Sequence, residues 1–124
     1  MEQIKHTIDL PVPPTLNTIW RRGSGRTYAS PTYLAWQKQA DAHAMVQRLK
    51  VQTISGDFTA EIGIDRARTR ADLDNVGTKA LFDWAQSREL IRNDKHCVGY
   101  SVKWVSTVDA PAGCRMTISA HEKK

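Results

Sequence analysis

Two aspartates separated by one residue, Asp72 and Asp74, are followed by Lys79 and Asp94. Side chains alternate along an extended backbone, so these two carboxylates would project to the same side, whereas on a helix they would diverge by about 200°. Like charges held close together repel each other, and a cation between them relieves this cost. Mg²⁺ and Mn²⁺ prefer oxygen ligands and retain bound water. The spacing therefore indicates a site for a catalytic divalent metal ion.

The same pair also has an ordinary structural interpretation. Asp74 stands directly before Asn75 and Val76, and an aspartate just ahead of a helix is a common N-cap. Pairs with this spacing occur in many proteins. The spacing alone leaves a metal site and a helix start both open.

The charge balance favours a polyanionic partner. The chain of 124 residues carries 18 lysines and arginines against 13 aspartates and glutamates, which gives a net charge of +5 and a pI near 9.5. This length suits one domain with a substantial core, and this charge suits nucleic acid. An acidic pair within a basic chain suggests basic surfaces that hold a phosphate backbone around a small metal site.

Six arginines in two segments are the candidate nucleic-acid-binding residues: Arg21, Arg22, Arg26, Arg66, Arg68 and Arg70. The first three lie in residues 11–29, where no periodicity is apparent, and an irregular stretch of this length is usually functional or mobile. A loop that grips phosphates and a solvated turn explain that segment equally well. Contacts of this kind would position a DNA backbone without reading its bases, so they predict no sequence preference.

No segment of the sequence is apolar enough to span a bilayer. The longest uncharged runs, at residues 10–20 and 27–37, are short and both contain proline. The first residues are polar and do not resemble a signal region. We therefore expect a cytoplasmic protein with no membrane association. The four histidines have no zinc-binding spacing.

Hydrophobic periodicity predicts six elements in a single domain over residues 1–124. Strands are expected at residues 4–10, 57–65, 97–107 and 114–120, and helices at about 31–50 and 75–87. Because no strand is a continuous apolar run, the prediction is an α+β fold in the order β-α-β-α-β-β, with two helices on one face of a mixed sheet. The last two strands are expected to form a hairpin. Its register would keep Cys97 and Cys114 too far apart for a disulfide.

The two predicted helices have predicted inner faces. In the first helix, one arc should face the core: Leu34, Ala35, Ala42, Met45, Val46 and Leu49. Trp36 falls on the opposite face, where it could contact nucleic acid, meet a second subunit or cover a loop. In the second helix, the arc expected to be buried contains Val76, Ala80, Leu81, Trp84 and Ala85. Lys79 and Asp83 fall on its polar side.

Several motifs together resemble the RusA family of Holliday-junction resolvases, the crossover junction endodeoxyribonucleases. The resemblance covers residues 7 to 105. The motifs are Pro11-Val12-Pro13-Pro14 with Asn17, Gly25-Arg26-Thr27-Tyr28, the arginine-rich run into Asp72-Leu73-Asp74-Asn75, Lys79, Phe82-Asp83 and Asp94. Their combination is more specific than any one of them.

The resemblance implies a homodimeric, Mg²⁺-dependent endonuclease, with Mn²⁺ as an alternative ion. Such enzymes cut four-way DNA junctions in recombination and repair and are often carried by phages. Asp72, Asp74 and Asp94 match the catalytic, metal-binding acids of the family, and Lys79 matches its essential lysine. Whether one or two ions bind does not follow from the sequence.

Lys79 departs from the family pattern by one position. The lysine usually follows the second acid by four residues, but here the interval from Asp74 to Lys79 is five. One insertion, plausibly at Gly77, explains this shift. We expect the turn before the helix to absorb it, because glycine lowers the backbone cost of an irregular turn. The ammonium group should then lie within about 4 Å of the acidic cluster, or one water beyond it.

Other functions remain open at this point. A basic DNA- or RNA-binding module would use the acidic cluster only structurally, and an inactive homologue would bind junctions without cutting them. A nuclease for flaps or other branched DNA is a further alternative. Metal-dependent nicking of a synthetic four-way junction separates an enzyme from a binding module.

Overall fold

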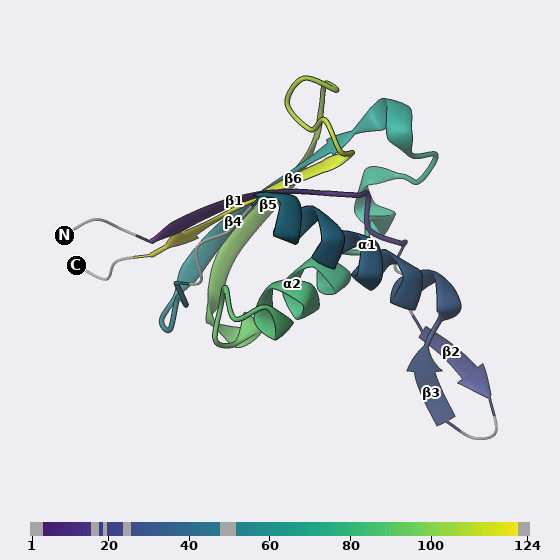
Figure 1. Cartoon of the computed structure of the whole chain (residues 1–124), viewed down its shortest axis with the longest axis horizontal. Coiled ribbons are helices and arrows are strands. Elements are labelled where there is room, and N and C mark those ends of the chain that lie inside the picture. Colours follow the sequence, from purple (N-terminus) through teal and green to yellow (C-terminus); the bar gives the residue numbers. More distant parts are fainter. Residues whose placement is uncertain (1–3, 16–17, 19, 24–25, 48–51, 122–124) are drawn as a thin grey trace.

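The fold is built on a four-stranded mixed sheet with the strand order β1-β6-β4-β5 (Figure 1). The computed structural model describes residues 4–15, 18, 20–23, 26–47 and 52–121. Its sheet strands are β1 (Lys5–Leu10), β4 (Phe58–Asp65), β5 (Cys97–Val105) and β6 (Cys114–Ala120). Strand β6 is antiparallel to both β1 and β4, whereas β4 and β5 are parallel. The α+β class and the mixed sheet are as predicted.

Two helices cover one side of this sheet: α1 (Pro31–Gln47) and α2 (Thr78–Ser87) (Figure 1). The side facing them is apolar, and one row across it contains Ile8, Met116, Ile62 and Val102 in register. The other side is more polar, with the row Thr7, Thr117, Glu61 and Ser101. This alternation across the pleat is the one predicted from the sequence.

The predicted hairpin between the last two strands is wrong. Strand β4 lies between β5 and β6, so these two strands do not pair. The most buried strand takes the centre because only a central strand is covered on both edges: from Ile62 to Asp65, every residue of β4 is buried. Cys97 and Cys114 are both free.

The predicted inner face of α1 is also wrong. Its buried residues are Tyr33, Trp36, Ala40 and Ala44. The expected core residues Leu34, Met45 and Val46 are 49%, 74% and 83% exposed, and Ala35 and Ala42 are exposed as well. Leu49 lies outside the described residues.

The reason for this inversion is the size and the polar handle of Trp36. Its indole Nε1 donates a hydrogen bond to the carbonyl oxygen of Pro11 at 3.0 Å, so the ring covers the segment after β1. Ala40 and Ala44 follow on the same face, and their small side chains let α1 pack closely. The apolar residues of α1 itself are distributed over several sides of the helix, so their periodicity does not define one buried face. Of the alternatives for Trp36, covering a loop is the observed one.

Helix α2 has the predicted inner face but starts later than expected. Val76, Ala80, Leu81, Trp84 and Ala85 are all buried, as predicted. The helix begins at Thr78 instead of residue 75, because the preceding residues form a separate short turn.

Residues 20–29 contain a hairpin where an irregular stretch was predicted. Strands β2 (Trp20–Gly23) and β3 (Arg26–Ala29) pair as an antiparallel ribbon that projects beyond the start of α1 (Figure 1). Arg21 and Arg22 are on β2, and Arg26 is on β3; their side chains are outside the description. Within the described residues, no helix is long and apolar enough to cross a membrane.

Candidate active site

All four predicted catalytic residues lie on the connection between the parallel strands β4 and β5. Parallel neighbours require such a crossover, and this one contains α2. Asp72 and Asp74 come before α2, Lys79 is in its first turn, and Asp94 opens a 3₁₀ turn directly before β5. The crossover therefore carries Asp74 and Asp94 to the helix-facing side of β5, which is an edge strand of the described sheet.

The segment Asp72–Asp74 is not fully extended, which corrects the geometry assumed from the sequence. Asp72 is extended, with φ −72° and ψ 152°, but Leu73–Asn75 form one 3₁₀ turn. The alternative of an ordinary helix start is wrong for Asp74, because the residue that precedes α2 is Gly77. The Asp72 side chain makes no capping hydrogen bond either.

The backbone is irregular just before α2, where the insertion was expected. Gly77 has φ −76° and ψ 68°, and the Thr78 amide donates to the Val76 carbonyl oxygen at 2.8 Å, which is the pattern of an inverse γ-turn. Val76 also forms an isolated bridge with Thr15. This bridge fixes the turn against the proline-rich segment, so α2 is regular from Thr78 onward.

Three aspartates differ from the others in having no side-chain partner within the part of the chain that the structure describes. The chain has nine aspartates, and six of them accept hydrogen bonds or ion pairs: Asp9, Asp41, Asp57, Asp65, Asp83 and Asp109. Among the described residues, nothing pairs with the carboxylates of Asp72, Asp74 and Asp94. Asp72 and Asp74 are exposed and Asp94 is partly buried. Among the described aspartates, the unpaired ones are thus the three that the sequence singled out.

Lys79 forms an ion pair within its own helix. Its Nζ lies 3.5 Å from Oδ1 of Asp83, one turn further along α2. Asp83 also hydrogen-bonds the hydroxyl of Tyr33 on α1; burial, and then the charge of Asp83, raises the pKa of that tyrosine. Lys79 was expected within about 4 Å of the acidic cluster or one water beyond it; among the described residues, its ion pair is with Asp83 and not with an acid of that cluster.

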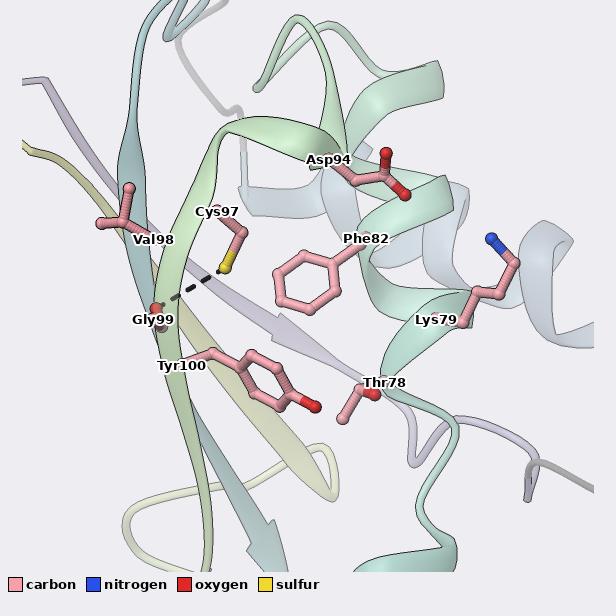
Figure 2. Close-up of a pocket in the computed structure, with 8 residues that line it drawn as sticks. All are labelled: Thr78, Lys79, Phe82, Asp94, Cys97, Val98, Gly99 and Tyr100. Carbon is pink, nitrogen blue, oxygen red and sulfur yellow. Dashed lines mark hydrogen bonds between the residues drawn. The ribbon is translucent and has the colours of Figure 1, made fainter.

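Two neighbouring cavities are lined by three of the four candidate residues, and Asp72 lines neither of the two. The first, of about 500 Å³, lies between α2 and β5, and Lys79 and Asp94 reach it from different elements (Figure 2). The second, of about 440 Å³, is lined by Asp74. Thr78 and Tyr100 line both cavities. The acids are thus spread along one surface beside β5.

The donor chemistry suits a hard divalent cation only in part. Free carboxylates on an exposed surface are the ligands that Mg²⁺ prefers, and it commonly uses one or two of them together with water and substrate phosphates. Among the described residues, however, no three acidic, histidine or cysteine side chains come close enough to hold one ion together. A site made of one or two carboxylates with phosphate oxygens fits this geometry; a preformed three-carboxylate cage does not.

The family model of endodeoxyribonuclease RusA matches residues 10–118, nearly the whole chain. The chain belongs to the RusA endodeoxyribonuclease family. No curated protein matches it. The match extends further towards the carboxyl end than the motifs quoted above, and so includes β6 and the turn before it.

The second arginine segment of this RusA-family chain is partly committed to its own fold. Arg68 donates to the Pro111 carbonyl oxygen at 3.0 Å and lies 3.7 Å from Asp65. The Arg66 guanidinium lies over the Trp104 ring, 5.5 Å from its centroid. Arg70 is exposed and has no partner among the described residues. Of these three arginines, Arg70 is the most available to a ligand.

Two contributions to the RusA-family site were missed in the sequence. Asp65, expected only as a strand end, is buried; it accepts hydrogen bonds from the Ala67 amide and the Thr107 hydroxyl and so fixes the start of the crossover. Tyr100 was expected to face inward with its alternate neighbours, and it does point to the helix side of β5. It is 56% exposed because the helices do not cover this edge strand. Its placement between Asp74 and Asp94 was not visible in the sequence.

Proposed function

We propose that this chain is a metal-dependent, structure-specific endonuclease that resolves four-way DNA junctions. The observation that carries the proposal is the set of three unpaired aspartates on the crossover of a RusA-family chain. The other six aspartates, only one of which is buried, all have a hydrogen-bond or ion-pair partner. Carboxylates left free beside a cavity in a basic protein are suited to bind a cation that in turn binds phosphate.

The reaction requires a water molecule in line with the leaving oxygen and relief of negative charge on the phosphate. A divalent ion, when bound, would supply both, because it would activate a water molecule and offset negative charge on the phosphate. Asp74 lies on one side of Tyr100 and Asp94 on the other, and these carboxylates would hold the ion together with a phosphate of the substrate. Asp72 lies two positions before Asp74 in the chain. One or two of these carboxylates would thus orient the ion and its water relative to the phosphate.

Lys79 is proposed to donate to a phosphate oxygen as charge develops there. Its present partner does not prevent this. The pair with Asp83 is exposed, and ion pairs of this kind contribute little to stability. A phosphate group in the cavity can therefore replace the carboxylate as partner, while Asp83 keeps the ammonium group directed along this side of α2 until DNA binds.

Binding is proposed to use arginine contacts with the DNA backbone. Arg70 and Arg66 lie on the crossover next to the acids, and Arg21, Arg22 and Arg26 lie on the β2–β3 hairpin. Each phosphate neutralised should add about −0.9 to the log–log slope of affinity against salt on duplex arms. Such contacts grip the junction without reading its sequence.

Two cuts on opposite strands are needed to turn a four-way junction into two duplexes. A two-fold symmetric homodimer presents two equivalent sites for them, and we propose this assembly for the active protein. A monomer mass from light scattering, both with and without junction DNA at micromolar concentration, would contradict it.

The deciding experiment is cleavage of a synthetic four-way junction with and without Mg²⁺ or Mn²⁺. Paired, symmetry-related nicks that require the ion support the proposal. A junction-binding homologue without activity is the second candidate, favoured by the lack of a three-residue ion site among the described residues. It would bind the junction at every ion concentration and cut nothing. Faster cleavage of flaps than of junctions would instead indicate a different branched substrate.

A further inference from the structure

Tyr100 occupies the position between the candidate catalytic groups. Tyr100 and Thr78 line both cavities. Asp74 lines one of these cavities, and Lys79 and Asp94 line the other. Figure 2 shows its ring extending from β5 towards the first residue of α2. Any phosphate held by these acids therefore brings its own nucleotide close to this ring.

The ring is held in place from one side and open on the rest. It meets Phe82 edge to face, with centroids 5.5 Å apart and planes at 76°. Phe82 in turn packs on Phe58 at 6.1 Å, and Phe58 is fully buried. This row of three rings runs from the core to the surface. It fixes Tyr100 in orientation, yet the residue stays 56% exposed, and its hydroxyl has no partner among the described residues.

We propose that Tyr100 stacks on a nucleobase adjacent to the cleaved phosphate and so positions that phosphate between Asp74 and Asp94. This inference rests on the proposed nuclease function and adds a substrate contact to it. Every base presents a π-face, so a fixed, exposed ring can hold one without sequence preference. Bases that are already unpaired or poorly stacked leave a duplex at the lowest cost, and a branch point is where such bases are available.

The test uses side chains that separate aromaticity from size. Tyr100→Phe keeps the ring, whereas Tyr100→Leu keeps only apolar bulk. Ser101→Ala is the matched control, because Ser101 is the next residue of β5 and faces the opposite side of the sheet. The probe is a four-way junction with 5-iododeoxyuridine at one branch nucleotide at a time, irradiated without divalent ions so that no cleavage intervenes. Cross-linked peptides are identified by mass spectrometry.

We expect the unmodified protein to cross-link through Tyr100 at a branch nucleotide, and the phenylalanine variant to do so at the same position. The leucine variant should lose this cross-link. Its single-turnover cleavage rate should fall about tenfold or more, because the loss of one base–aromatic stack weakens substrate binding by about that factor. The Ser101 variant should match the unmodified protein in both assays.

Four results would overturn the inference. A protein that cleaves junctions but cross-links elsewhere, or a leucine variant that cleaves normally, would leave the nuclease intact and remove the role of Tyr100. A leucine variant that becomes monomeric while the unmodified protein is dimeric would make Tyr100 an interface residue of the exposed β5 edge. Failure of the unmodified protein to bind or cut any branched DNA would remove the proposed function and this inference together.

Discussion

Replacing Asp74 by asparagine should separate chemistry from stability. The carboxylate is exposed and has no partner among the described residues, so the amide replaces it without loss of a hydrogen bond or ion pair. Exposed changes of this kind usually alter the free energy of unfolding by no more than about 0.5 kcal/mol. For a chain of this length that corresponds to a shift in Tm of about 2 °C. Cleavage should nevertheless fall by more than about a hundredfold, equivalent to about 2.7 kcal/mol of barrier.

The assay compares three quantities in the same preparation: Tm, junction affinity and the single-turnover cleavage rate. Affinity should persist or increase, because the substitution removes a negative charge that faces the phosphates. Asp109→Asn is the control, since it makes the same chemical change at an exposed aspartate whose hydrogen-bond partner is Ser106. That variant should keep its cleavage rate.

Two outcomes would refute this reasoning. If Asp74→Asn lowers Tm by much more than the control substitution does, the Asp74 carboxylate has a structural partner and is not available to an ion. If a well-folded variant loses junction binding and cleavage together, the residue belongs to the DNA-binding surface and not to the chemical step.

Four further outcomes are expected. Lys79→Ala should reduce the cleavage rate at least about tenfold with nearly unchanged junction affinity, because the lost ion pair is exposed; normal cleavage would exclude Lys79 from the site. Trp36→Ala should lower the urea-derived free energy of unfolding by about 3–5 kcal/mol, whereas Val46→Ala, at an 83% exposed position, should change it by less than about 0.5 kcal/mol; equal effects would contradict the assignment of the helix faces. Millimolar Mg²⁺ or Mn²⁺ should raise Tm, because an ion at 100 times its dissociation constant stabilises the native state by about 2.7 kcal/mol. The rise should be smaller in the Asp74 variant. An unchanged melting curve would argue against an ion site in the free protein. Burial raises the pKa of Cys114 to about 12, so at pH 8 a thiol reagent should modify Cys97 in the native protein and both cysteines only after denaturation; rapid labelling of both would contradict this burial.

Elements with one buried face were predictable because periodicity records that face directly. Strands β1 and β6 alternate as expected, as does β4 before Ile62, and α2 has a single apolar arc with Lys79 and Asp83 opposite to it. Helix α1 could not be oriented in this way, because apolar residues lie on several of its sides. The choice between Trp36 and Met45 depends on a hydrogen bond to Pro11 and on the close approach allowed by alanines, and both of these are tertiary contacts.

The order of strands in the sheet was out of reach for a similar reason. Two consecutive strands with a turn between them suggest a hairpin, yet β4 pairs with β5 and β6 across long sequence separations. For the site, spacing together with the family resemblance predicted Asp72, Asp74 and Asp94, but the backbone at the first two depends on the 3₁₀ turn at Leu73–Asn75. A single extended segment was the simpler assumption, and the backbone does not adopt it.

The position of β5 at the sheet edge has a consequence for the motions of the protein. Only β4 pairs with it in the sheet, so half of its backbone groups have no ladder partner. Strands held on one side open at lower free energy than central ones and exchange their amide hydrogens sooner. Since β5 forms a wall of both cavities, its opening would disassemble the site while the core around β4 stays folded. DNA that spans the two cavities would oppose this opening. Slower amide exchange along β5 would then report DNA binding without any need for cleavage.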